Sequence, residues 1–128
     1  MDYYISKMVH CGFDEAVERA VAELDKQGFG ILTEIDMQEK LRDKLGVEFR
    51  PYMILGACDP QLAHQALLAE DKTGVLMPCN VIVQQLDDGS VEVAAMNPQV
   101  MADTTGNQEI GKLAAEAETR IRAALDSM

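Results

Sequence analysis

Residues 52–60 read Tyr-Met-Ile-Leu-Gly-Ala-Cys-Asp-Pro, and the rest of the fold prediction is built around this stretch. The nearly continuous apolar run at 52–58 predicts a strand buried in the middle of a sheet. Pro51 marks the beginning of that strand, because proline cannot donate a ladder hydrogen bond. Asp59 is a favoured N-cap residue and Pro60 a favoured first helical residue, so we expect a helix directly after the strand.

On the N-terminal side of this stretch, the pattern predicts two strands and two helices. Apolar residues recur at helical spacing from Phe13 to Leu24, and Gly28 can close the last turn of that helix. Asp36 and Glu39 have the spacing of a capping box, which predicts a short helix beginning at this point. The predicted elements are strands over 3–9 and 30–35, a long helix that stops at Gly28, and a short helix over 37–45.

On the C-terminal side, the helix that follows Asp59 is expected to run to about residue 71. The sequence Asp87-Asp88-Gly89 between two apolar runs is typical of a hairpin turn, since glycine adopts positive φ at little cost. The predicted strands cover 80–86 and 91–96. A last long helix is expected from about Asn107, with an apolar stripe along one side.

This order predicts a single domain over residues 1–128 with an α+β fold. We expect a two-layer β-α-β4-α sandwich: a largely antiparallel five-stranded sheet, two main helices and two short helices. If the second to fifth strands form a meander, the end of the third strand lies beside the start of the fourth. Cys58 and Cys79 would then share one edge of the sheet, and Cys11 would fall at the opposite edge.

Composition and charge limit the functions that the chain can have. The hydrophobic fraction is 48% and the charged fraction 26%, as in soluble globular proteins. Acidic residues outnumber basic ones by 22 to 11, giving a net charge of −11. Such a surface repels nucleic-acid phosphates and anionic lipids, so we expect neither nucleic acid nor membrane as a partner. Residues 1–7 do not resemble a secretory signal, and the three cysteines then indicate reduced thiols in the cytoplasm.

The two cysteines at the predicted sheet edge are the best candidates for chemistry. Cys58 precedes a helix N-terminus, which favours a thiolate, whereas the charge of Asp59 opposes it. The alternative is that Cys58 and Cys79 are small packed core residues. Two thiolates could also bind Cu(I) or zinc, with a further ligand from Met77, Met53 or His64. No C-x-x-C spacing supports a zinc site, so we expect no metal and no cofactor.

Several motifs along the chain together resemble the DUF302 family, a domain of unknown function. The N-terminal part of the resemblance includes Gly28-Phe29-Gly30 and Glu34-Ile35-Asp36. Its central and C-terminal parts are Tyr52, Leu55-Gly56, Cys58-Asp59-Pro60, Gly74 to Cys79, Asp87-Asp88-Gly89, and Met96-Asn97-Pro98 with Met101. The resemblance covers nearly the whole chain and implies a β-α-β4-α sandwich and a homodimer. It implies no catalytic residues.

The sequence therefore leaves three functions open. The first is a cytoplasmic homodimer that acts as a binding or accessory module for an unknown small molecule, without conventional catalysis. The second is a thiol-based protein that uses Cys58 and Cys79 for sulfur transfer, redox sensing or soft-metal binding, with Asp59, His64 or Met77 as auxiliary residues. The third is a pocket for a small apolar ligand between the sheet and the helices.

Overall fold

The structure, a computed structural model, describes residues 2–128. The strands are β1 (Tyr4–Val9), β2 (Gly30–Asp36), β3 (Tyr52–Cys58), β4 (Cys79–Gln85) and β5 (Val91–Met96). The helices are α1 (Phe13–Lys26), α2 (Met37–Leu45), α3 (Pro60–Ala69), α4 (Gln99–Thr105) and α5 (Gln108–Asp126), with a 3₁₀ helix η1 (Asp71–Leu76) between α3 and β4.

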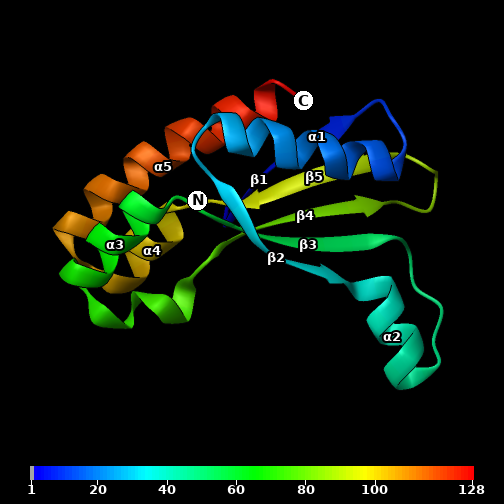
Figure 1. The fold of residues 1–128 in the computed structure, drawn as a ribbon, viewed down its shortest axis with the longest axis horizontal. Coiled ribbons are helices and arrows are strands. Elements are labelled where there is room, and N and C mark those ends of the chain that lie inside the picture. The colour runs from blue at the N-terminus through cyan, green and yellow to red at the C-terminus, as the bar shows by residue number, and fades with distance from the viewer. Residues whose placement is uncertain (1) are drawn as a thin grey trace.

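The five strands form one antiparallel sheet in the order β1-β5-β4-β3-β2. Strands β2 to β5 are a meander, and β1 pairs with β5 to complete the sheet. Helices α1 and α5 lie side by side against this sheet (Figure 1). Helices α3, η1 and α4 gather at one end of the molecule around α5, whereas α2 lies at the other end beside β2 and β3. The expected α+β sandwich is confirmed.

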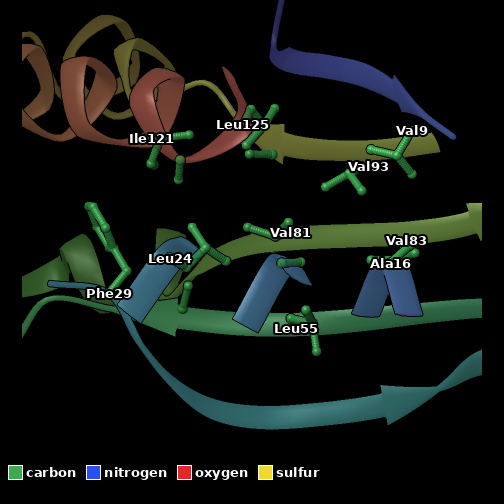
Figure 2. Packing of buried hydrophobic residues seen from close by; sticks show 14 of the residues in the cluster. Val9, Ala16, Leu24, Phe29, Leu55, Val81, Val83, Val93, Ile121 and Leu125 are labelled. Carbon is green, nitrogen blue, oxygen red and sulfur yellow. The ribbon is translucent and has the colours of Figure 1, made fainter. Parts of the chain in front are cut away.

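The main core lies between the sheet and the two long helices. Leu55 on β3, Val81 and Val83 on β4 and Val93 on β5 are fully buried and point toward the helices (Figure 2). These positions follow the two-residue period of a strand, which places alternate side chains on one face. Leu24, buried on α1, and Ile121, buried on α5, pack against them. Burying each such side chain stabilises the fold by about 1.5–3 kcal/mol.

A second, smaller core lies at the α3 end of the molecule. Its buried members are Ala66 on α3, Met101 on α4 and Ile110 on α5. Half-buried apolar side chains that include Met77 and Leu113 surround them. The domain therefore has two apolar clusters, one under the long helices and one among the short helices.

The helix starts and stops follow local signals. The Asp36 carboxylate accepts a hydrogen bond from the Glu39 amide at 3.0 Å and caps α2. The Asp59 carboxylate accepts bonds from two amides of the first turn of α3, at 2.8 and 3.1 Å. The Asn107 side chain caps α5 in the same way. Gly28 has a φ of 88°, a left-handed conformation that glycine adopts without strain. The sequence predicted the caps at Asp36 and Asp59, the glycine at 28 and the helix start near Asn107. Of the capping box expected at Asp36 and Glu39, the described hydrogen bonds include the half in which the Asp36 carboxylate accepts.

Besides one-residue differences at the start of β1 and the end of β2, three segments differ from the sequence prediction. Helix α3 ends at Ala69, before the expected residue 71, because the chain continues as the 3₁₀ helix η1. Strand β4 begins at Cys79, one residue early, and ends at Gln85. Helix α4 was not predicted, because seven residues are too few to show helical periodicity. The Asn97 side chain accepts a hydrogen bond from the Gln99 amide and so begins this helix.

The face of the sheet opposite the long helices carries apolar side chains too. Because Leu55 and Val81 face the helices, the alternate residues Ile54 and Ile82 face the other way, and they pair across β3 and β4. The short helix α3 packs against α5 and η1, and α2 lies at one end of the sheet. Half-exposed side chains at the two sheet edges include Tyr4 at 42% and Ile35 at 39% exposure.

Candidate functional site: an apolar pocket with two thiols

A pocket of about 290 Å³ lies between α3, α5 and the ends of β3 and β4. Its wall draws on both apolar clusters: Phe29 and Leu62 belong to the main core, and Met101 and Ile110 to the smaller one. The pocket is thus the gap between the two cores. The wall is almost wholly apolar, and its charged member is Asp59.

Small side chains on the two facing helices keep this gap open. Ala63 and Ala66 of α3 lie three residues apart and so share one side of that helix. Ala114 and Ala117 have the same spacing on α5, and all four line the pocket. Since α3 and α5 pack against each other, alanine at these positions leaves space that larger side chains would fill.

The register of the sheet brings Cys58 and Cys79 together. Cys79 pairs directly with Ala57, the residue before Cys58, and both cysteines line the pocket. Both are half-buried free thiols, so they do not form a disulfide. The sequence prediction that they share one sheet edge on neighbouring antiparallel strands agrees with this register.

Cys11 lies at the other end of the strands. It follows Val9, which pairs with Val91, and Val91 in turn pairs with Gln85 at the far end of β4. Six residues of extended chain separate Gln85 from Cys79, a distance of about 20 Å. Cys11 therefore takes no part in the pocket.

The surroundings of the two thiols favour their protonated forms. Burial raises the pKa of the Cys79 thiol to about 11, and the neighbouring Cys58 adds to the rise. Burial, together with the negative charge of Asp59, also raises the pKa of Cys58. The sequence left open whether the helix N-terminus or Asp59 would dominate at Cys58. In the structure, the effects that disfavour a thiolate are the larger ones.

The auxiliary residues named from the sequence lie in different places. Asp59 and Met77 line the pocket beside the cysteines. His64 is exposed on α3 outside the pocket wall, and Met53 packs against the main core. Met101 lines the pocket and was not among the predicted candidates. A signal for it existed, because Met101 belongs to the family motif around Asn97 and Pro98.

Arg120 of α5 forms an ion pair with Asp59, the charged residue of the pocket wall. Its guanidinium donates hydrogen bonds to the Asp59 carboxylate at 2.8 Å and to the Gln27 carbonyl at 2.7 Å. It also lies over the Phe29 ring, 5.1 Å from the ring centre. A side chain at Gly28 would meet both the guanidinium and the carboxylate within 3 Å, so glycine is required there for close approach. Arg120 thereby ties together α5, the α1–β2 turn and the start of α3.

The ion pair sets the charge state of Asp59, whose side chain is 12% exposed. Burial alone would raise the pKa of this carboxyl group. The hydrogen bonds from Arg120 and from the Leu62 and Gln61 amides outweigh burial, so its pKa is lowered. Asp59 is therefore an ionised carboxylate whose oxygens already accept hydrogen bonds from Arg120 and two backbone amides, which leaves few acceptor positions for a ligand.

Comparisons with known proteins place the chain in a family. It belongs to the DUF302 family, a domain of unknown function, whose model matches residues 5–128. The fold is similar to the crystal structure of an uncharacterized conserved DUF302 protein from Bacillus stearothermophilus, with a TM-score of 0.89 and 30% sequence identity. That similarity covers 97% of this chain and 96% of the other. No curated protein matches the chain.

Among residues 2–128, no helix is both long and apolar enough to cross a membrane. Within the same residues, histidine, cysteine and carboxylate side chains nowhere gather in threes in a way that would hold a metal ion.

Proposed function

We propose that this domain is a binding module that holds a small, uncharged, apolar ligand in the pocket between α3, α5 and the ends of β3 and β4. The observation that carries the proposal is a pocket of about 290 Å³ with an almost wholly apolar wall. This volume is close to the lower end of small-molecule sites. At roughly 30 Å³ for each water-sized group, it suits a ligand of about ten non-hydrogen atoms.

The chemistry of the wall supports an uncharged ligand. A charged group that enters the pocket would lose its hydration, and the apolar wall would not replace it. Asp59 already bonds to Arg120 and to two backbone amides. The binding free energy would therefore come chiefly from removing apolar surface from water.

The thiol-based alternative has less support as a nucleophilic or redox function. Both thiols are favoured in their protonated forms, whereas the thiolate is the nucleophile in sulfur transfer and disulfide exchange. Soft-metal binding, the remaining part of this alternative, is supported because both cysteines line the same pocket.

The proposal includes a cytoplasmic location and a homodimer. Three free cysteines support a reducing compartment, where thiols remain unpaired. The half-exposed apolar residues on the sheet face opposite the long helices support association of two copies through that face.

Filling the pocket tests the ligand proposal. Ala66→Leu on α3 and Ala114→Leu on α5 place extra methyl groups in the gap, and Ala115→Leu on the exposed side of α5 is the matched control. Naphthalene and 1-nonanol are suitable uncharged probes of about the right size, with binding measured by ligand-observed NMR. We expect saturable binding to the wild type and to Ala115→Leu, and an affinity at least about tenfold weaker in the two filled variants.

Thermal unfolding of all four proteins controls for the fold. If neither probe bound the wild type, or if the filled variants bound both probes as tightly as Ala115→Leu, the proposal would be wrong.

A further inference from the structure

Four sulfur-bearing side chains line one pocket in this domain. They are Cys58 at the end of β3, Met77 after η1, Cys79 at the start of β4 and Met101 on α4. Two of them are thiols on neighbouring strands, and Met77 is separated from Cys79 by one residue. Met77 and Met101 also pack in the same small apolar cluster. Sulfur is thus concentrated where the rest of the wall is hydrocarbon.

Thiolates and thioethers are soft ligands, and together they select Cu(I) over harder divalent ions. The apolar wall limits the access of water that would compete for the ion. The carboxylate nearby does not act as a hard ligand, because Asp59 is engaged by Arg120.

From this arrangement we infer that the sulfur-bearing wall of the pocket is a binding site for a monovalent soft metal ion, Cu(I), with Cys58 and Cys79 as thiolate ligands and Met77 as a thioether ligand. Two S–H bonds break and two Cu–S bonds form, and both protons pass to the solvent. Copper remains in the +1 state throughout, so the step needs no oxidant or reductant. The thioether contributes a lone pair without losing a proton.

The inference goes beyond the proposed function and does not depend on it, because it rests on the sulfur atoms alone. It also predicts a distinctive pH dependence. An ordinary thiol is protonated near neutral pH and binds Cu(I) as a thiolate, so the binding of Cu(I) by two cysteines displaces two protons. The association constant should then rise about 100-fold per pH unit between about pH 6 and 8.

Competition with a chromogenic Cu(I) chelator under anaerobic conditions tests the site on the whole chain. We expect one Cu(I) per wild-type chain. Cys58→Ser and Cys79→Ser should each weaken binding at least about 100-fold and reduce the pH dependence to about tenfold per unit. Met77→Leu should cause a smaller loss. Cys11→Ser is the matched control, because Cys11 lies at the other end of the sheet, and it should bind as the wild type does.

Thermal unfolding shows whether each variant is folded, and Cys79→Ala replaces Cys79→Ser if the buried hydroxyl destabilises the protein. The inference is overturned if the wild type takes up no stoichiometric Cu(I), or if the Cys58→Ser/Cys79→Ser double variant binds it equally well. Naphthalene binding separates this outcome from the proposed function. A wild type that binds naphthalene but takes up no Cu(I) overturns the inference alone, whereas one that takes up Cu(I) but binds no naphthalene overturns the proposed function alone.

Discussion

At the scale of single residues, burial decides what Cys79 can do. Its thiol lies in the wall of an apolar pocket, and a charged sulfur there would lose its hydration. A position beside a helix start or another thiol therefore does not by itself produce a reactive cysteine. The environment of the sulfur has to be known as well.

Alkylation by iodoacetamide should show this directly. Because the pKa of Cys79 is raised to about 11, its modification rate should keep increasing from pH 7 to about pH 11. A free thiol, with a pKa of about 8.5, reaches its plateau well before that. Mass spectrometry of the peptide that contains Cys79 gives the rate, with glutathione as the reference. A plateau below about pH 9 would contradict the prediction.

The residues that could be predicted from the sequence are those whose partners are local. Asp36 and Asp59 were recognised as caps because the amides they bind lie two or three residues away. Arg120 could not be recognised in the same way, since it lies 61 residues from Asp59. Its role depends on the packing of α5 against α3, which no local pattern shows.

At the scale of elements, α3 is held by its N-cap residue, Asp59. Asp59 caps the helix through two amides and pairs with Arg120 of α5. Loss of this side chain removes the cap and leaves the Arg120 guanidinium partly buried without its counter-ion. Both effects act on the wall of the pocket.

Asp59→Asn should separate the two effects, because asparagine still caps a helix but carries no charge. We expect a loss of about 1 kcal/mol in the free energy of unfolding for Asp59→Asn and about 2 kcal/mol for Asp59→Ala. The pKa of Asp59 is lower in the folded protein than in the unfolded one. The charge contribution is therefore fully present above about pH 4 and is lost as the pH falls through the folded pKa.

Urea unfolding at a series of pH values measures this difference. The control is Asp71→Asn, whose carboxylate is 83% exposed and pairs with the equally exposed Lys72. It should change stability by less than about 0.5 kcal/mol at any pH. A wild-type advantage over Asp59→Asn that persisted unchanged at pH 2 would argue against the ion pair as its source.

The pocket itself arises at the element scale, and the sequence did not locate it. The alanines of α3 and α5 could be assigned to apolar stripes, and a small apolar ligand was kept as one alternative. The sequence could not show that Ala66 and Ala114 lie on two helices that face each other. An alanine stripe against a large neighbour is a filled core, whereas the same stripe against another alanine stripe leaves a gap.

At the scale of the whole molecule, the sheet is covered differently on its two faces. The long helices bury one face, and the other presents Ile54, Ile82 and the half-exposed Tyr4. The sheet order could be predicted because a short hairpin joins β4 to β5, and because strands that follow one another along the chain usually lie side by side. The position of α2 beside one end of the sheet could not, since its nine residues include none that is buried.

Light scattering at micromolar concentration tests the homodimer. We expect a mass of about twice the 14.1 kDa of one chain. Ile82→Lys should give a monomer, because it places a charge in the middle of the face proposed to be buried between two copies. Val75→Lys is the control, as Val75 is 85% exposed on η1, away from that face. A wild-type mass near 14.1 kDa would mean that the protein is a monomer and that the sheet face opposite the long helices is exposed to solvent.

One irregularity of the sheet has a consequence for how copies of this chain meet. The register of β2 against β3 shifts between Ile31 and Thr33, which leaves Leu32 as an extra residue on an edge strand. A bulge interrupts the regular row of unpaired amides and carbonyls that an edge strand would otherwise offer to a foreign strand. The bulge therefore makes this edge a poorer template for fibril-like growth, and the same extra residue, Leu32, lines the pocket while remaining largely exposed.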